Sequence, residues 1–208
     1  MPRILTVANF KGGTGKTTTA LNLASILASE LNVLLVDACA RGSASWWAQR
    51  GSMPFDWTAE TESQLLRQLP AASGYDLAAI DTAAAHSDRT WQAAVAVADW
   101  LILPAPPIPM ALAALIETAS NARALTAAPQ QGLLLMVNAR YPSEAREAQQ
   151  SLQAVGIPTF ERWVRAYKVH QRCPLEGIPI TAAAGKHARA AAADYRRIAV
   201  ELLQGLSP

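Results

Sequence analysis

The chain has 208 residues, 51% of them apolar and 16% charged, which excludes a disordered protein and leaves room for a substantial core. Two cysteines far apart in the sequence, Cys39 and Cys173, exclude a disulfide framework and a cysteine metal cluster. The net charge of +2 is uneven, because residues 1–138 hold 8 Lys and Arg against 10 Asp and Glu, while residues 139–208 hold 10 against 6. No repeat or dividing linker is present, so we expect residues 1–208 to form a single domain.

The first predicted element is a strand over residues 4–8, followed by a glycine-rich turn and a helical pattern over residues 17–29. Strand, glycine-rich turn and helix form the context in which backbone N–H groups and the helix dipole bind phosphate. In such a site Lys16 would contact the β- and γ-phosphates, and the Thr17 hydroxyl would be a Mg²⁺ ligand. The predicted phosphate-binding residues are Lys11, Gly12, Gly13, Thr14, Gly15, Lys16, Thr17 and Thr18.

This turn departs from the usual P-loop at its beginning. Phe10 occupies the place of the usual first glycine, and a second lysine, Lys11, precedes the glycine pair. The stretch from Lys11 to Thr17 therefore resembles the deviant Walker A motif of the ParA/MinD/nitrogenase iron protein superfamily of P-loop NTPases. The resemblance implies that the chain binds ATP and Mg²⁺ and that Lys11 and Lys16 are catalytic. It also implies an ATP-bound homodimer in which Lys11 reaches the partner's nucleotide.

A second predicted strand, residues 33–36, ends at Asp37. In the superfamily that the chain resembles, this strand ends in Asp-x-Asp-Pro-Gln, and the second aspartate is credited with orienting the attacking water. Asp37 matches the first aspartate and is a third catalytic candidate, whereas Cys39, Ala40 and Arg41 replace the last three residues. Because a thiol accepts hydrogen bonds poorly, we expect ATP binding with slow hydrolysis.

The Mg²⁺ partner of Thr17 is predicted in a strand over residues 75–82 that closes on Asp81. An aspartate at this position resembles the Walker B residue that holds Mg²⁺ directly or through water. The alternative is a strand-end aspartate that only caps the next turn. In the superfamily the following loop senses the γ-phosphate, and here the loop over residues 82–85 carries alanines in place of the usual proline pair.

The remaining elements alternate between helices and strands. The pattern predicts a helix with Ser43 as its N-cap, a short strand within 51–60, and a helix over 61–69 that Pro70 stops. It then predicts a helix over 88–98, a strand over 100–103 that ends at Pro104, a helix over 109–126 and a strand over 131–137. The last predicted elements are a helix over 142–155, a short edge strand over 157–160 and a helix over 184–203. This alternation with short loops predicts an α/β fold with a doubly wound, mostly parallel sheet and helices on both faces.

Asn138 and Arg140 follow the predicted strand over residues 131–137. The resemblance implies adenine recognition at this position, so both residues are predicted to bind the nucleotide. The alternative is an asparagine that simply turns the chain at the end of a strand.

The last third of the chain combines its excess of positive charge with interleaved aromatic residues, as in a nucleic-acid-binding surface. Phosphate contacts of this kind give salt-sensitive binding without sequence preference. The alternative is a solvated face on which these cations pair with Glu161, Glu176 or Asp194. The predicted DNA contacts are Arg162, Arg165, Lys168, Arg172, Lys186 and Arg189.

Two branches of the superfamily fit this chain poorly. Nitrogenase-type members need cluster-ligating cysteines, and membrane-cycling members need a basic amphipathic C-terminal helix, neither of which the sequence contains. The chain therefore looks most like the small ParA-type (ParF-like) partition ATPases. That likeness implies a cytoplasmic, nucleoid-associated switch that dimerises with ATP and binds DNA nonspecifically, without a membrane partner.

In such a switch a cargo-adaptor protein stimulates slow ATP hydrolysis, and the cargo is a plasmid, a chromosome region or a protein body such as a carboxysome. Two other functions remain open at this point. One is a metabolic P-loop enzyme of the dethiobiotin synthetase kind, and the other is an ATP-binding scaffold that scarcely hydrolyses its nucleotide.

Overall fold

The computed structural model describes residues 1–84 and 88–206, which are built around one six-stranded sheet. The strands lie in the order β3-β2-β4-β1-β5-β6, and every neighbouring pair is parallel. The doubly wound, parallel α/β sheet predicted from the sequence is therefore confirmed. The strands are β1 (Arg3–Val7), β2 (Val33–Ala38), β3 (Asp56–Ala59), β4 (Leu77–Thr82), β5 (Trp100–Ala105) and β6 (Gln130–Leu134).

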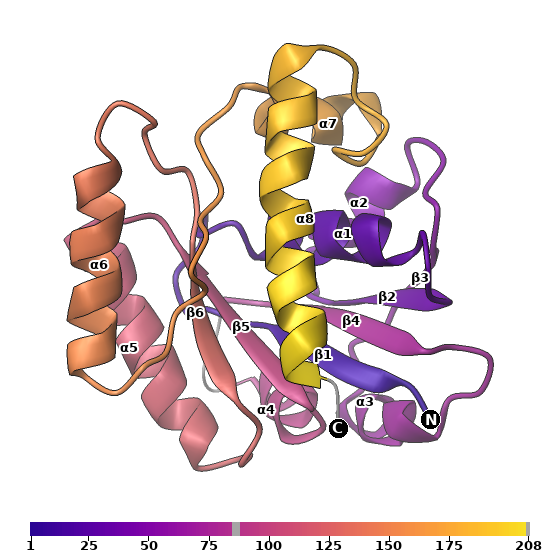
Figure 1. Cartoon of the computed structure of the whole chain (residues 1–208). Coiled ribbons are helices and arrows are strands. Elements are labelled where there is room, and N and C mark those ends of the chain that lie inside the picture. Colours follow the sequence, from indigo (N-terminus) through magenta and orange to yellow (C-terminus); the bar gives the residue numbers. More distant parts are fainter. Residues whose placement is uncertain (85–87, 207–208) are drawn as a thin grey trace.

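Helices cover both faces of the sheet (Figure 1). One face carries α1 (Lys16–Leu27), α2 (Ser43–Ala48), α7 (Val169–Glu176) and α8 (Lys186–Leu206). The other face carries α3 (Ser63–Gln68), with the short 3₁₀ helix η1 (Leu69–Ala71), α4 (Arg89–Ala96), α5 (Pro109–Arg123) and α6 (Pro142–Ala154). No helix in the part of the chain that the structure describes is both long and apolar enough to cross a membrane.

The central strand β4 shows why the strands read as continuous apolar runs. Leu77 and Ala79 pack into the cluster that α1 and α8 cover, whereas Ala78 and Ile80 pack into the cluster of α3 and α4. Side chains alternate between the faces of a strand, so a sheet buried on both sides needs apolar residues at successive positions.

The register of the central strands brings the predicted site residues to one edge of the sheet. Val7, the last residue of β1, pairs with Asp81 of β4, and Asp81 pairs with Asp37 of β2. Because the strands are parallel, the loops that follow them all leave from the same edge. The glycine-rich turn after β1 is thus next to Asp81, and Asp37 lies one strand further along the same edge.

Strand β5 runs through Pro104, so the predicted end of this strand at Pro104 was wrong. The pairing of β5 with β1 stops at Ile102, opposite Val7. Pro104 lies beyond this point, so the absence of its N–H removes no hydrogen bond between β5 and β1. The Pro104 carbonyl instead accepts a hydrogen bond of 2.9 Å from Asn9 Nδ2.

Strand β6 ends at Leu134, three residues before the predicted end. Met136 has a positive φ of 55°, which turns the chain out of the strand, and Val137 then makes only an isolated bridge with Arg165. The predicted edge strand over 157–160 is likewise reduced to a single bridge at Thr159.

The N-cap of α2 was also predicted wrongly. Ser43 is the first helical residue, and the N-cap is Gly42, whose φ of 62° is left-handed. The start of this helix is stabilised instead by a carboxylate from β2, described below.

Candidate phosphate-binding site

The glycine-rich turn depends on its glycines for shape and for space. Gly13 and Gly15 have φ values of 75° and 88°, a left-handed conformation that residues with a side chain rarely adopt. A Cβ on Gly15 would also collide with the side chain of Leu135, which follows β6. The turn can therefore bring successive backbone N–H groups close together just before α1 begins at Lys16.

The beginning of the turn is attached to the neighbouring helices. The Phe10 N–H donates to Thr118 Oγ1 of α5 at 2.9 Å, and the Phe10 ring lies 4.8 Å from the ring of Trp91 in α4. Asn9 Oδ1 accepts from the Lys11 N–H at 2.8 Å. These contacts explain why an aromatic residue stands where most P-loops have glycine, because here the side chain has a packing role.

The two lysines of the turn lie in different environments. Lys16 is 8% exposed, and its Nζ donates to the Lys11 carbonyl at 3.1 Å inside the turn. Burial lowers the pKa of Lys16, while the charges of Asp81 and Cys39 act to raise it. Lys11, in contrast, is exposed to solvent. Lys16 is therefore placed to contact an anion held by this turn, whereas the Lys11 side chain is not enclosed by the turn.

Thr17 and Asp81, predicted to hold Mg²⁺ together, are in direct contact. Thr17 Oγ1 donates to Asp81 Oδ2 at 2.6 Å, and the buried Asp81 Oδ1 has no hydrogen-bond partner. Burial raises the pKa of Asp81 to about 7; the Asp37 charge also raises it, and Thr17 and Lys16 oppose the shift. An unpaired carboxylate oxygen beside a hydroxyl fits Mg²⁺, which takes hard oxygen ligands.

The protein supplies only part of a Mg²⁺ coordination shell. Within residues 1–84 and 88–206 no group of three or more His, Cys, Asp or Glu residues could hold a metal ion. Mg²⁺ commonly completes its octahedral shell with water and substrate phosphate oxygens. The Thr17–Asp81 pair therefore fits a metal that arrives with a phosphate ligand.

Asp37 organises the turn that follows β2. Its Oδ1 accepts from the Cys39 N–H at 3.1 Å, and its Oδ2 accepts from the Ser45 N–H at 2.7 Å, in the first turn of α2. A carboxylate at a helix N-terminus is favourable because it accepts unpaired N–H groups. Both Asp37 oxygens are thus occupied by backbone donors, and its catalytic role stays a prediction.

A pocket of about 500 Å³ lies over the turn. The residues that line it come from three segments at the carboxyl edge of the sheet, each a loop with the adjoining end of a helix or strand: Gly12, Gly13, Gly15, Lys16, Thr17, Thr18, Cys39, Ala40, Arg41, Ser43, Thr82, Ala83 and Ala84. The predicted phosphate-sensing loop over 82–85 thus lines the pocket through its first three residues, and Ala85 lies outside the described residues. Apart from Lys11 and Thr14, every residue predicted to bind phosphate lines the pocket.

Asn138 and Arg140, predicted to bind the nucleotide, are exposed and do not line this pocket. Asn138 Oδ1 accepts from the Arg140 N–H at 3.0 Å, and the Asn138 carbonyl accepts from the Tyr141 N–H at 3.0 Å. This geometry is that of the chain-turning alternative. The predicted contact with adenine stays a prediction.

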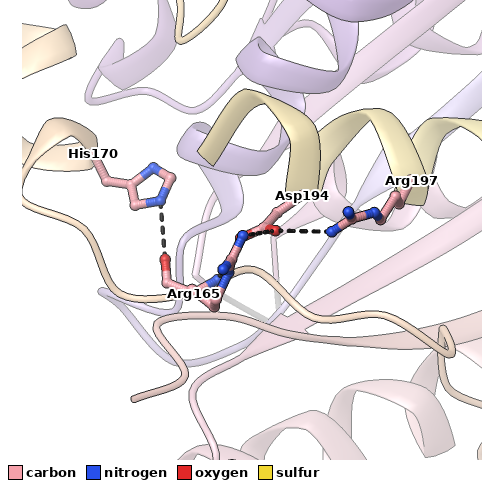
Figure 2. Close-up of polar contacts among 4 residues, drawn as sticks. All are labelled: Arg165, His170, Asp194 and Arg197. Carbon is pink, nitrogen blue, oxygen red and sulfur yellow. Dashed lines mark hydrogen bonds and ion pairs between the residues drawn. The ribbon is translucent and has the colours of Figure 1, made fainter. Parts of the chain in front are cut away.

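The six predicted DNA contacts differ in how available they are. Arg165 forms a two-point ion pair with the buried Asp194 of α8, with Nε–Oδ2 and Nη2–Oδ1 distances of 2.9 and 2.7 Å (Figure 2). This pair raises the pKa of Arg165. Arg197 approaches the same carboxylate at 3.6 Å, and Arg172 pairs with Glu176 at 2.9 Å.

For Arg165 and Arg172 the paired-cation alternative therefore holds. The other four candidates are exposed, and within the described residues none lies at ion-pair distance from a carboxylate. They are Arg162, Lys168, Lys186 and Arg189.

His170 was not singled out from the sequence. It is buried in α7, its Nε2 lies 3.2 Å from the Arg165 carbonyl, and its Nδ1 has no partner (Figure 2). Burial lowers the pKa of His170, while the Arg165 carbonyl and the Asp194 charge act to raise it. A single histidine in a basic stretch gives no sequence signal that it will be buried, because its burial depends on how α7 packs against α8.

Comparisons with known proteins agree with this geometry. Residues 5–161 match the family described as CobQ/CobB/MinD/ParA nucleotide binding domain. The maintenance of carboxysome distribution protein A of Gloeobacter kilaueensis is 50% identical over 203 residues, which cover 97% of this chain and 94% of that protein.

Solved structures share the fold at lower identity. A putative plasmid partition protein from Borrelia burgdorferi, bound to AMPPNP, superposes with a TM-score of 0.79 at 19% identity, over 99% of this chain and 100% of that one. The septum site-determining protein MinD of Pyrococcus horikoshii, complexed with Mg-ADP, superposes with a TM-score of 0.75 at 20% identity, over 99% of this chain and 98% of that one.

Proposed function

We propose, from the premise that the chain belongs to the CobQ/CobB/MinD/ParA nucleotide-binding domain family, that it is an ATP-dependent switch that positions carboxysomes. The relative that supports this cargo is a carboxysome distribution protein that matches nearly the whole chain at 50% identity. The observation that carries the proposal is the glycine-rich turn, with Lys16 buried inside it and Lys11 exposed beside it.

ATP would be held by the turn that precedes α1. The backbone N–H groups of the turn and the N-terminus of α1 would bind the phosphates, and Lys16 would exchange the Lys11 carbonyl for phosphate oxygens. Thr17 and Asp81 would hold Mg²⁺, which supplies charge neutralisation on the β- and γ-phosphates. A plasmid partition relative bound to AMPPNP and a MinD bound to Mg-ADP support this choice of ligands.

The proposed switch assembles two subunits. The exposed Lys11 would contact the nucleotide of the partner subunit, so that ATP favours the dimer. Dimerisation would place two sets of exposed cations on one dimer, which raises its avidity for nonspecific DNA. The dimer would therefore associate with the nucleoid in the cytoplasm. An adaptor protein bound to the cargo would stimulate hydrolysis and release the DNA.

Hydrolysis without the adaptor is expected to be slow. Cys39 lines the pocket where the family that the chain resembles has an aspartate, and its thiol is a poor acceptor for a proton or for a hydrogen bond from water. ATP binding and dimerisation do not need this carboxylate, so the switch would remain in its assembled state for long periods.

DNA pelleting with ATP, with ADP and without nucleotide tests the proposal. We expect the protein to sediment with DNA only with ATP, and raising salt from about 50 to 200 mM should reverse the binding by orders of magnitude. A Lys168→Ala/Lys186→Ala variant should sediment less, whereas Arg67→Ala on α3 should behave as the wild type. Sedimentation that is equal in all three nucleotide conditions would contradict the switch.

A further inference from the structure

The turn after β2 presents an arginine to the phosphate pocket. Asp37 fixes this turn by accepting the N–H groups of Cys39 and Ser45, and the Gly42 N–H closes it on the Cys39 carbonyl at 2.7 Å. Gly42 has a left-handed φ of 62°, so the reversal of the chain occurs directly after Arg41. Arg41 is exposed and lines the same pocket as the glycine-rich turn.

The described lining of this pocket is positively charged. Lys16 and Arg41 are its two cationic side chains, and no Asp or Glu is among the lining residues within 1–84 and 88–206. Arg41 also has no carboxylate at ion-pair distance in the described part of the chain. Its guanidinium is therefore available to an anion in the pocket and is not committed to a structural ion pair.

The position of the turn identifies which part of a bound nucleotide Arg41 can reach. Residues 39–41 and Lys16 line the same pocket, and Cys39 is among the groups that act on the pKa of Lys16. In P-loop proteins the lysine at the position of Lys16 contacts the β- and γ-phosphates, so an arginine that lines the same pocket is a candidate ligand of the terminal phosphate.

We infer that Arg41 is a phosphate-contacting residue that binds the terminal phosphate of the triphosphate in its own subunit and so distinguishes ATP from ADP. The inference rests on the proposed function, since it requires that the pocket binds ATP. The guanidinium group matches phosphate oxygens in a two-point geometry, and its charge is kept at any physiological pH. Replacing Asp and Gln of the usual motif by Cys39 and Arg41 thus turns an acidic wall into a basic one.

The inference is tested by measuring calorimetrically the affinities of AMPPNP and ADP, each with Mg²⁺, for the wild type and three variants. We expect Arg41→Gln to weaken AMPPNP binding about tenfold or more, as for loss of a hydrogen bond to a charged group, and to change ADP binding by less than about twofold. Arg41→Lys should recover part of the loss, because it keeps the charge without the two-point geometry. The control Arg67→Gln removes an equally exposed arginine from α3 and should change neither affinity.

The outcomes separate this inference from the proposed function. A wild-type protein that binds neither nucleotide would contradict both. If the wild type binds AMPPNP tightly and Arg41→Gln binds it equally well, the role of Arg41 is overturned and the proposed function is not. The same conclusion follows if Arg41→Gln no longer sediments with DNA while its AMPPNP affinity is unchanged. Unfolding of each nucleotide-free variant by urea confirms that a loss of binding does not come from a loss of fold.

Discussion

At the scale of single residues, the pocket combines a phosphate turn that follows its motif with residues 39–41, which depart from theirs. Lys16, Thr17 and Asp81 meet in the arrangement that their motifs predict, with Thr17 Oγ1 2.6 Å from Asp81 Oδ2. Cys39 lines the same pocket, at the position where the motif predicts an aspartate. The chemical rate should therefore depend on residue 39 more than binding does.

Replacing Cys39 by aspartate should increase ATP turnover about tenfold or more in the presence of DNA, because a carboxylate can orient and deprotonate water where a thiol cannot. Release of inorganic phosphate at saturating ATP measures the change. Cys39→Asn is the matched control, since it keeps the size of the new side chain without its charge and should leave turnover low. Equal turnover in the wild type and Cys39→Asp would show that Cys39 does not limit the reaction.

The sequence could predict these contacts because each follows directly from a strand or helix end. Asp81 is the last but one residue of β4 and Lys16 the first of α1, so the parallel register alone brings them together. The sequence offers Asp194 as one partner of the basic cluster but does not assign it to Arg165, since this pair joins positions 29 residues apart across a loop and a helix. Charge density along the sequence does not distinguish a free cation from a paired one.

At the scale of elements, the segment from Arg165 to α8 is held together by buried polar groups. Asp194 of α8 accepts three hydrogen bonds from Arg165, and His170 contacts both the Arg165 carbonyl and the ring of Tyr195. Protonation of His170 would add a donor at Nδ1, which is buried and has no acceptor. The neutral form of His170 is therefore the one that the fold stabilises, in agreement with its lowered pKa.

This gives the nucleotide-free protein a pH-dependent stability. A histidine with a lowered folded-state pKa contributes stability that is complete above its unfolded-state pKa of about 6.5 and is lost as the pH falls through 6.5 toward the folded-state value. Between pH 7.5 and 5.5 the wild type should lose about 1 kcal/mol more unfolding free energy than His170→Phe, which keeps the aromatic packing. Urea unfolding at the two pH values measures the difference, and other titrating groups, Asp81 included, cancel between the proteins. Identical losses of unfolding free energy in the wild type and His170→Phe would contradict the assignment of this pH dependence to His170.

The element boundaries show where prediction from pattern stops. The positions of β1, β2, β4, β5 and β6 along the chain followed from apolar runs, but β5 continues through Pro104 because β1 has already ended beside it. Strand β6 stops early because Met136 adopts a positive φ. The end of β5 depends on the neighbouring strand and the end of β6 on a turn, and neither can be predicted from the local pattern of apolar residues.

At the scale of the whole molecule, the sheet places one lysine inside the subunit and one at its surface. Lys16 is buried in the turn, whereas Lys11 is exposed at the edge of the sheet where all the loops meet. A second subunit that covered this edge would complete the phosphate environment of the first. Nucleotide binding and assembly would then be separable by mutation.

Lys11→Ala should abolish dimerisation with ATP while it leaves the folded monomer intact, because the exposed Lys11 side chain forms no ion pair with the residues that the structure describes. Light scattering with AMPPNP and Mg²⁺ measures the molar mass, and the nucleotide affinity of the monomer is determined in parallel. Lys168→Ala, which also removes an exposed lysine, should dimerise as the wild type does. A Lys11→Ala protein that still doubles its mass with AMPPNP would refute the assembly in which Lys11 crosses to the partner.

The contact between Phe10 and Trp91 has a practical consequence. The Phe10 ring belongs to the phosphate turn, the indole of Trp91 is buried in α4, and their centroids are 4.8 Å apart. Indole emission depends on the groups packed around the ring, so a displacement of the turn by its ligand would change the fluorescence of this tryptophan. The chain thus contains an optical reporter that is packed against the phosphate turn.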